Sequence, residues 1–318
     1  MASSSRQKVK PVFNPFSKKS TKKENGRKQA LLALALVTAS TAAWFLTPVS
    51  SIITSFILLS IPIHEDIELG VESWRQMRYK YPIVPDKWGV KAIGRELASK
   101  IVHSDSFCGK RLDFDQCKKQ MRQYRWSFEV VSAPEVNAFA LPGGIVRVTD
   151  SLLNRLNLSK GEIAGLLAHE CGHVLHRHSQ ARVLKKNLVE TVLKALVYED
   201  GDDRQESFGE AVGEILLTGA KFIGEMKFSR KDEYEADDAA FDILASSNVY
   251  DPRAVKSLLE KLWSLNGGSG RSGQAGMMGF IEGWDRTHPG TEDRIEALAK
   301  RWNEMSSHER RKYNGLVR

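Results

Sequence analysis

The longest apolar stretch of the chain lies near its start, between residues 29 and 63. It contains no Asp, Glu, Lys or Arg over 35 residues, whereas a membrane-spanning helix needs only about 20. Pro48 interrupts it, which predicts one kinked or tilted span, or a span followed by a segment at the membrane interface. The alternative is a cleaved signal peptide, but its apolar core is usually about 7–15 residues long. The length therefore favours a retained transmembrane signal-anchor over residues 30–63.

After the anchor, the pattern of apolar positions predicts helices around one small sheet. Helical periodicity runs through residues 68–103. Alternating faces then predict strands at 126–131 and 145–149. Between them, prolines and glycines bracket the segment 137–141, and a short helix follows at 152–156. This is the only sheet that the sequence predicts.

From Lys160 onward the predicted elements are almost all helical. Apolar positions three and four residues apart predict helices at 161–186, 207–227, 229–247, 252–265 and 291–302. The acidic cluster and the glycine-rich segment between these helices predict loops, at 199–203 and 267–283. The fold class that we expect is α+β, mostly helical, with a small sheet.

The net charge of +8 is confined to a tail that precedes the anchor. Residues 1–28 hold nine Lys or Arg and a single acid, Glu24, so the rest of the chain sums to zero. A neutral body does not predict a nucleic-acid partner. Because positive residues stay on the side from which a protein is inserted, the tail is expected in the cytoplasm or matrix, and the body across the membrane.

The chain thus divides into a basic tail at residues 1–29, the anchor at 30–63 and one domain at 64–318. Its three cysteines do not make a disulfide framework. Cys108 and Cys117 lie nine residues apart and could pair in an oxidising compartment, but free thiols are the simpler expectation.

His169, Glu170 and His173 form an HExxH motif, the sharpest chemical signal in the chain. Two histidines four residues apart lie on one face of a helix, so both imidazoles can reach one ion. Glu170 can then reach a water on that ion. Zinc fits because its catalytic sites use imidazole and carboxylate ligands and leave one position open. The apolar run 163–168 predicts a buried helix, on which these polar side chains need partners.

A third protein ligand is required, and spacing alone leaves it open. The two usual offsets from the motif fall on Ser179 and Leu193, neither of which is a zinc ligand. Glu233 and Asp237 remain, four residues apart on one face of the predicted helix 229–247. Glu233 as a ligand and Asp237 as acceptor for a ligand histidine's N–H are chemically coherent. An acidic, solvent-facing helix explains the neighbouring acids Asp232, Glu235 and Asp238 well, so the residues alone leave Glu233 about evenly balanced between the two roles.

Four motifs in order resemble the membrane-bound HExxH zinc peptidase family that includes the CAAX prenyl protease and the bacterial peptidase HtpX. They are the segments 137–146, the HExxH helix, 229–237 and 287–295. One N-terminal anchor before one soluble domain is most similar to the branch of the mitochondrial inner-membrane stress peptidase and its bacterial envelope relatives. The resemblance implies a zincin-like (gluzincin) catalytic domain, one zinc ion per chain and hydrolysis of peptide bonds.

The resemblance also implies roles for the residues around the metal. His169, His173 and Glu233 would hold the zinc ion, and Glu170 would act as general base on the zinc-activated water. Asp237 would support a ligand histidine from behind.

Further roles follow from the same resemblance for residues outside the ligand set. His288 would steady the tetrahedral oxyanion or fill the open position of the metal at rest, and Arg294 would support that loop or the intermediate. Asn137, Ala138 and Phe139 would lie on the edge strand where the substrate backbone docks as an added strand.

Two more histidines follow the motif, His176 and His178. If the helix continues, His178 lies about 180° around it from His169 and cannot share the zinc, while His176 lies on the ligand face one turn further along. We expect both to be structural or to support the ligands.

Together these features predict a membrane-anchored zinc metalloendopeptidase that cleaves membrane or misfolded proteins in protein quality control. Its expected partners are protein substrates and the bilayer, with a homo-oligomer left open and no nucleic acid. The mitochondrial inner membrane is the favoured location, although a bacterial inner-membrane or endoplasmic-reticulum anchor would look similar. The alternative is a chaperone-like quality-control binding protein with a latent or structural zinc site, which has no need of Glu170.

Overall fold

The computed structural model describes residues 61–103, 122–186, 227–265 and 282–317, together with residues 58 and 119. Outside them lie the predicted basic tail, nearly all of the anchor, the helix at 207–227, the acidic loop, and the pair Cys108 and Cys117. Within the described ranges, no helix is both long enough and apolar enough to cross a bilayer.

Two helices, not one, carry the periodicity seen at 68–103. α3 spans Ile63–Met77 and α4 spans Val90–His103. Two prolines lie between them and lack the backbone N–H that a helix needs. Asp86 then starts α4, because its carboxylate accepts hydrogen bonds from the backbone N–H groups of residues 88–91 at 2.8–3.1 Å.

The sheet has three strands, β1 (Ser127–Val131), β2 (Ala138–Leu141) and β3 (Ile145–Thr149). β3 is central, with β1 parallel on one side and β2 antiparallel on the other. Gly143 turns the chain between β2 and β3 with a φ of 78°. A side chain there would meet the backbone of Ile67 on α3 at 2.6 Å, so the turn packs closely on that helix. β2 is therefore an edge strand of the described sheet.

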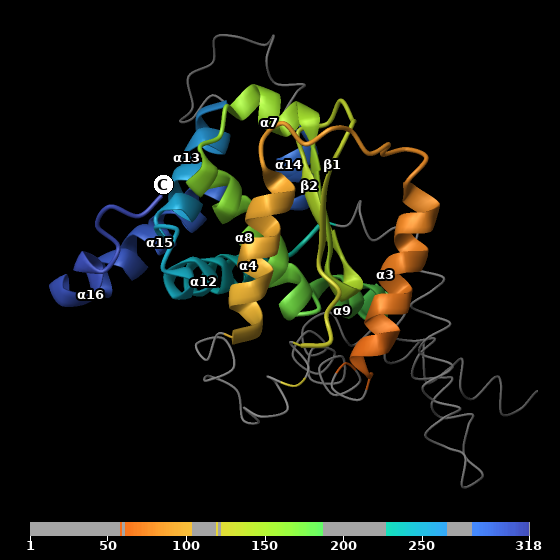
Figure 1. The fold of residues 1–318 in the computed structure, drawn as a ribbon, viewed down its shortest axis with the longest axis horizontal. Coiled ribbons are helices and arrows are strands. Elements are labelled where there is room, and N and C mark those ends of the chain that lie inside the picture. The colour runs from red at the N-terminus through yellow and green to blue at the C-terminus, as the bar shows by residue number, and fades with distance from the viewer. Residues whose placement is uncertain are drawn as a thin grey trace, which may run out of the picture. The chain divides into compact units, whose positions relative to one another are not determined.

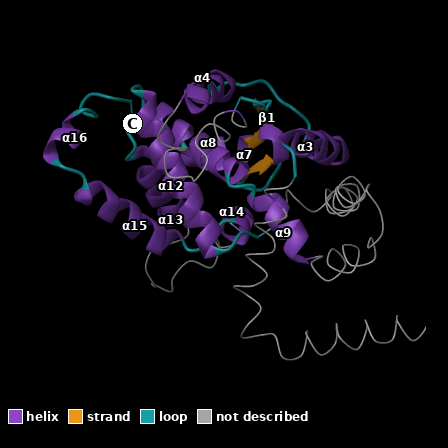
Figure 2. Cartoon of the chain, turned by 90° about the horizontal axis from the view of Figure 1, so that it is seen from below, coloured by secondary structure: helices purple, strands orange, loops and turns teal. Residues whose placement is uncertain are grey.

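Helices pack on both sides of this sheet (Figures 1 and 2). α3 lies on one side, and α4 and α8 (Lys160–Leu175) lie on the other. α8 follows the short helix α7 (Asp150–Leu156) and begins at a capping box made by Ser159 and Glu162. All its residues from Gly161 onward are buried, as the apolar run before the HExxH motif predicts.

α12 (Arg230–Ser247) crosses α8 at close range. A side chain at Gly172 would lie 2.7 Å from the carbonyl oxygen of Ala236, so small residues permit this approach. The later helices of the described chain are α13 (Ala254–Leu265), α14 (Glu282–Thr287), α15 (Thr291–Glu304) and α16 (Ser307–Arg311). The predicted class, α+β and mostly helical with a small sheet, is confirmed.

The prediction of one helix over 161–186 is wrong. α8 ends at Leu175 and α9 begins at His178 and runs to Lys186, with Arg177 between them at a φ of 54°. This left-handed conformation is unfavourable for a residue with a side chain, so neighbouring contacts must hold it. The guanidinium donates to three acceptors at the start of the described chain: the carbonyl oxygens of Leu58 and Ile61 and the carboxylate of Asp66. These acceptors lie more than 100 residues earlier, where local periodicity cannot reveal them.

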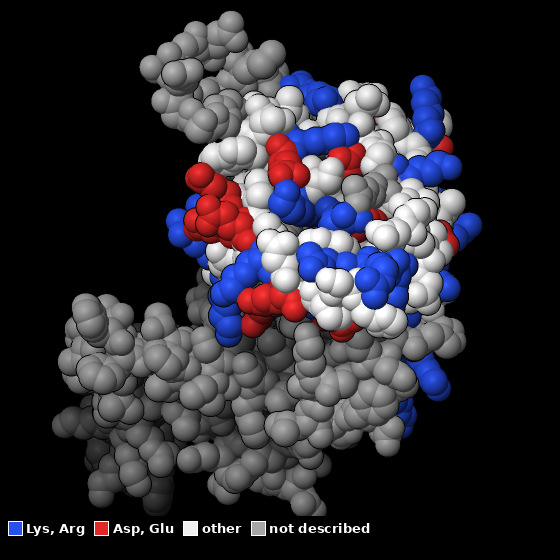
Figure 3. All heavy atoms as spheres, turned by 90° about the vertical axis from the view of Figure 1, so that its left-hand side faces the viewer, with Lys and Arg blue, Asp and Glu red and all other residues white. Residues whose placement is uncertain are grey.

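The face formed by the C-terminal helices carries both signs of charge (Figure 3). Basic and acidic side chains lie interspersed there. Some pair between helices, as Arg301 of α15 does with Asp238 and Asp242 of α12, at 2.8 and 2.6 Å. This mixture matches a body whose charges sum to zero outside the basic tail.

Candidate metal centre

α8 carries the HExxH side chains into one enclosed space. His169 and His173 lie one turn apart, with their Nε2 atoms separated by 3.1 Å. Each is only 1% exposed, and Glu170 is fully buried. The carboxylate Oε1 of Glu170 lies 3.7 Å from Nε2 of His288. The three motif residues therefore converge on the same point.

α12 brings Glu233 to this point from the other side. Its Oε2 lies 3.6 Å from Nε2 of His169, and its Oε1 lies 3.5 Å from Nε2 of His173. A capping box between Ser229 and Asp232 starts α12 at Arg230, which places Glu233 in the first turn of the helix. Spacing alone left Glu233 open between a ligand and a solvent-facing acid, and the structure places it fully buried among histidines.

The segment after α14 closes the space with His288. Its Nδ1 lies 3.2 Å from Oε1 of Glu233 and 3.4 Å from Nε2 of His169. One possible ligand atom from each of four residues lies within 4.8 Å of the others; these residues are His169, His173, Glu233 and His288. The structure thus brings together the residues that the sequence assigns to the metal and to its open position.

Asp237 and Arg294 form a layer behind these residues. Oδ1 of Asp237 accepts a hydrogen bond from Nδ1 of His169 at 2.8 Å, which leaves Nε2 of that ring to face the centre. Arg294 donates to both carboxylate oxygens of Asp237, at 2.7 and 2.8 Å, and its Nη1 lies 2.6 Å from Oε2 of Glu233. Burial opposes the charge on Asp237, yet Arg294 outweighs it and lowers the pKa of Asp237 to about 2.

Burial and charge act on the pKa values of the central groups in different directions. Burial raises the pKa of Glu170 above its ordinary value and lowers the pKa of His173 well below its own. Burial also disfavours the charge on Glu233, but the positive charges of His288 and Arg294 outweigh it and lower the pKa of Glu233. Neutral imidazole and ionised carboxylate are the forms that bind a metal ion.

The donor set fits zinc. Two imidazoles and a carboxylate are a ligand set of catalytic zinc sites, which keep a fourth position open. Neither carboxylate oxygen of Glu170 has a hydrogen-bond partner among the described residues, although the side chain is fully buried. Such a group is costly in a helix that serves only packing, whereas a general base needs its lone pairs free to take a proton.

Ala138 and Phe139 begin the edge strand and Asn137 directly precedes it, and all three are buried. The side-chain oxygen of Asn137 accepts a hydrogen bond from Oγ1 of Thr287 at 3.3 Å. Phe139 packs against Tyr81, with ring centroids 5.1 Å apart. The predicted substrate strand is therefore tied to the segment that closes the metal centre.

Sequence reasoning missed two aromatic neighbours of the centre and misplaced a third residue. Trp284 stacks on His288 with centroids 4.2 Å apart, and Phe228 stacks on His173 at 4.0 Å. No spacing rule links either to the motif. The prediction that places His178 on the far side of the helix is wrong, because the helix breaks before it and its Nδ1 lies 2.9 Å from Nδ1 of His173.

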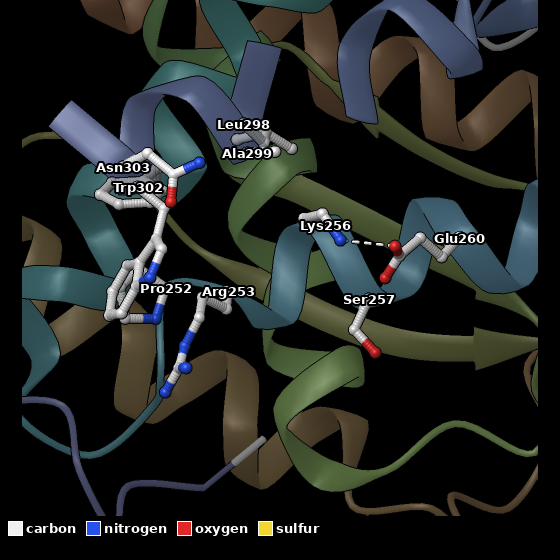
Figure 4. Close-up of a pocket in the computed structure, with 10 residues that line it drawn as sticks. Pro252, Arg253, Lys256, Ser257, Glu260, Leu298, Ala299, Trp302 and Asn303 are labelled. Atoms are coloured by element: carbon white, nitrogen blue, oxygen red, sulfur yellow. Dashed lines mark hydrogen bonds and ion pairs between the residues drawn. The ribbon is translucent and has the colours of Figure 1, made fainter. Parts of the chain in front are cut away.

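A separate hollow of about 350 Å³ lies between α13 and α15 (Figure 4). Charged residues along it are paired, Lys256 with Glu260 at 2.5 Å and Arg253 with Asp251. Trp302 lies under the guanidinium of Arg253, 4.3 Å from its central carbon. None of the metal-centre residues lines this hollow, so it belongs to the packing of the C-terminal helices.

A buried HExxH helix, a glutamate from a second helix and a small sheet with an edge strand define a class of metallopeptidases. Within this class the chain belongs to peptidase family M48, whose model matches residues 111–302. The resemblance indicated by the four motifs is therefore confirmed at the level of the family.

The chain is similar to curated proteins that are named as metallopeptidases or proteases. The chain is 33% identical over 175 residues to the mitochondrial metalloendopeptidase OMA1 of Arabidopsis thaliana, covering 55% of this chain and 31% of that protein. It is 34% identical over 146 residues to the metalloprotease YcaL of Escherichia coli, covering 46% and 54%. It is 32% identical over 199 residues to the protease HtpX of Stutzerimonas stutzeri, covering 54% and 65%. The matched part of the chain thus spans less than two thirds of the length of each of these relatives.

Proposed function

We propose that the chain is a membrane-anchored zinc metalloendopeptidase that hydrolyses peptide bonds of membrane or misfolded proteins in protein quality control. The observation that supports this most is the buried set His169, His173 and Glu233 beside a Glu170 carboxylate without a hydrogen-bond partner. The printed names of the relatives, metalloendopeptidase, metalloprotease and protease, support the same class.

His169, His173 and Glu233 would hold one zinc ion per chain. When bound, the ion would be a Lewis acid that polarises the scissile carbonyl and lowers the pKa of water to near neutrality. Glu170 takes the proton of the attacking water and passes it to the nitrogen of the leaving amine. Burial raises the pKa of Glu170 above its ordinary value, which favours a group that accepts a proton.

His288 serves two states of the site. A ring nitrogen of His288 lies within 4.8 Å of the possible ligand atoms of His169, His173 and Glu233, so His288 could itself help to hold the ion at rest. Once the substrate displaces it, its ring N–H can stabilise the oxyanion. Arg294 acts from behind, because its guanidinium is engaged with Asp237 and Glu233 and holds both carboxylates in place.

The edge strand would receive the substrate backbone. Ala138 and Phe139 begin β2 and Asn137 directly precedes it; β2 pairs with β3 along one side, so an extended peptide could add as a further strand. Because these residues are buried and Asn137 accepts a hydrogen bond from Thr287, a substrate would have to displace the contacts that cover them.

The membrane location rests on the N-terminal part of the chain. Residues 30–63 would anchor it in the bilayer, with the basic tail on the side of insertion and the catalytic domain on the other. The mitochondrial inner membrane is favoured, and the name of the Arabidopsis relative supports a mitochondrial location.

One observation favours the alternative, a chaperone-like quality-control protein with a latent zinc site. His169, Glu170, His173, Glu233 and His288 are all at most 1% exposed, so the site as described admits no substrate. The free lone pairs of Glu170 favour the peptidase, since a latent or structural site does not need them.

Glu170→Gln in the full chain separates the two functions. The variant keeps the shape of the side chain and all three ligands, so it should bind zinc like the wild type. Its cleavage rate should fall at least about 100-fold, because general-base catalysis contributes roughly 10²–10⁴-fold. Zinc content and cleavage of an unfolded membrane protein are measured together, with a chelator-treated wild type as reference.

His308→Gln is the matched control, because it changes an exposed histidine of α16 and leaves the ligands and their neighbours intact. It should retain both zinc and cleavage. Proteolysis by Glu170→Gln at the wild-type rate would contradict the mechanism. A zinc-loaded wild type without proteolysis would favour the chaperone-like function.

A further inference from the structure

The side of the His173 ring that faces away from the metal centre contacts His178, a residue that has no role in the proposed mechanism. Its Nε2 faces the centre, 3.5 Å from Oε1 of Glu233, and a metal-binding nitrogen must be unprotonated. The ring proton of His173 therefore belongs on Nδ1, which lies 2.9 Å from Nδ1 of His178. His178 must accept this hydrogen bond, so its own proton belongs on Nε2.

Glu235 completes the chain of hydrogen bonds. Its Oε2 lies 3.1 Å from Nε2 of His178 and can accept the proton that this nitrogen carries. The side chain of His178 is 4% exposed and that of Glu235 is 38% exposed, so this series of hydrogen bonds runs from the metal centre to the surface. Each donor meets an acceptor, and together the two contacts fix both tautomers.

The break between α8 and α9 is what places His178 behind His173. On a continuous helix, the side chain five residues further on would point away from the centre. The left-handed Arg177 turns the chain back, and its guanidinium is held by the buried Asp66 at 2.7 Å. Arg182 of α9 then pairs with Asp232 of α12 at 2.9 Å, which ties the new helix to the one that carries Glu235.

We propose that His178, with Glu235 behind it, is a positioning residue that orients His173 toward the metal and strengthens it as a ligand. The inference rests on the proposed zinc site. A hydrogen bond to the far nitrogen of a ligand imidazole holds the plane of the ring and makes the metal-binding nitrogen more basic. Asp237 does the same for His169, so each ligand histidine has its own support.

The test is the zinc affinity of the full chain, measured by chelator competition, together with kcat and KM for an unfolded protein substrate. His178→Leu removes both hydrogen bonds and keeps an apolar side chain in a buried place. It should weaken zinc binding about 10–100-fold, the usual effect of losing such a support. At saturating zinc, kcat should fall while KM stays close to that of the wild type.

Two amide variants locate the hydrogen bond. His178→Asn keeps an acceptor near the position of Nδ1 and should recover most of the zinc affinity. His178→Gln extends its amide to the position of Nε2, so it can reach Glu235 but not His173, and should bind zinc as weakly as His178→Leu. A purely structural role for His178 would not separate these two amides.

Further variants separate loss of the hydrogen bonds behind His173 from misfolding and from failure of the proposed zinc site. His308→Gln changes an exposed histidine of α16 that lies outside the metal centre and should leave zinc affinity unchanged. Glu235→Leu removes the acceptor of His178 at a partly exposed position and decides the matter if His178→Leu does not fold; it should weaken zinc binding, although less than His178→Leu, because water can replace part of the lost hydrogen bond. Wild-type zinc affinity in His178→Leu, or in Glu235→Leu where His178→Leu does not fold, would overturn the inference. A wild type that binds no zinc would overturn the proposed function, and the inference with it.

Discussion

The two histidines of the HExxH helix differ in what stands behind them. His169 donates to Asp237, a buried carboxylate whose two oxygens both accept hydrogen bonds from Arg294. His173 faces a second imidazole, His178, and the carboxylate behind that ring, Glu235, is partly open to solvent. One support is an ionic network sealed in the core, and the other is a chain of hydrogen bonds that reaches the surface.

This difference indicates which substitutions around the site should destabilise the folded protein most. Arg294 binds Asp237, which supports the proposed ligand His169, and it also lies against the proposed ligand Glu233. The sealed network therefore connects two proposed metal ligands through one cation. Removing one member of a buried network leaves an uncompensated charge, which is strongly destabilising. In the open support, water can replace a lost partner at Glu235.

Asp237→Ala should have the largest effect of the changes that test this comparison. It leaves the buried Arg294 guanidinium with Glu233 as its remaining acid, and we expect the free energy of unfolding to fall by about 3–5 kcal/mol. Urea unfolding of the metal-free protein, followed by circular dichroism, measures this loss. Asp238→Ala is the matched control, because Asp238 pairs with Arg301 at the surface and should contribute less than about 1 kcal/mol. Equal losses in the two variants would contradict a sealed network.

The second-largest effect should come from acid, which protonates Asp237 and removes its ionic contact with Arg294. The pKa of Asp237 is lowered from 3.8 to about 2, so its stabilisation is complete above pH 3.8 and is lost as the pH falls toward 2. A shift of this size corresponds to about 2 kcal/mol. The difference in unfolding free energy between the metal-free wild type and Asp237→Asn should therefore narrow steadily below about pH 4. A difference that stays constant with pH would show that folding does not lower the pKa of Asp237.

Glu235→Ala should have the smallest effect on stability. The side chain of Glu235 is 38% exposed and pairs with His178 and Lys231 at 3.1 and 3.5 Å. Partly exposed pairs of this kind contribute about 0–1 kcal/mol, so the unfolding midpoint in urea should hardly move. A loss as large as that of Asp237→Ala would mean that the second support is not open to solvent.

Much of this arrangement could be predicted from the sequence. The HExxH helix and its burial follow from local spacing and from the apolar run before the motif, and the small sheet follows from alternation. Glu233 could not be separated by spacing from the other acids of α12, because its burial depends on how closely α12 approaches Gly172 of α8. Only the family resemblance distinguished it.

The support behind His173 could not be predicted from local pattern at all. Apolar periodicity continues across residues 161–186, so it predicts one helix where the structure has two. The break depends on Arg177 and on its contact with Asp66, which lies 111 residues earlier in the chain. Contacts over such separations are set by the packing of the whole domain, and they decide here which histidine meets His173.

The most direct test of the account is the zinc content of the purified full chain and of its Glu233→Ala variant. Glu233 is the ligand that spacing left open, and His169 and His173 alone hold zinc too weakly for a catalytic site. We predict about one zinc ion per wild-type chain, and loss of both zinc and proteolysis in the variant, with the fold retained by circular dichroism. Equal zinc content in the two proteins would contradict the assignment of the metal centre.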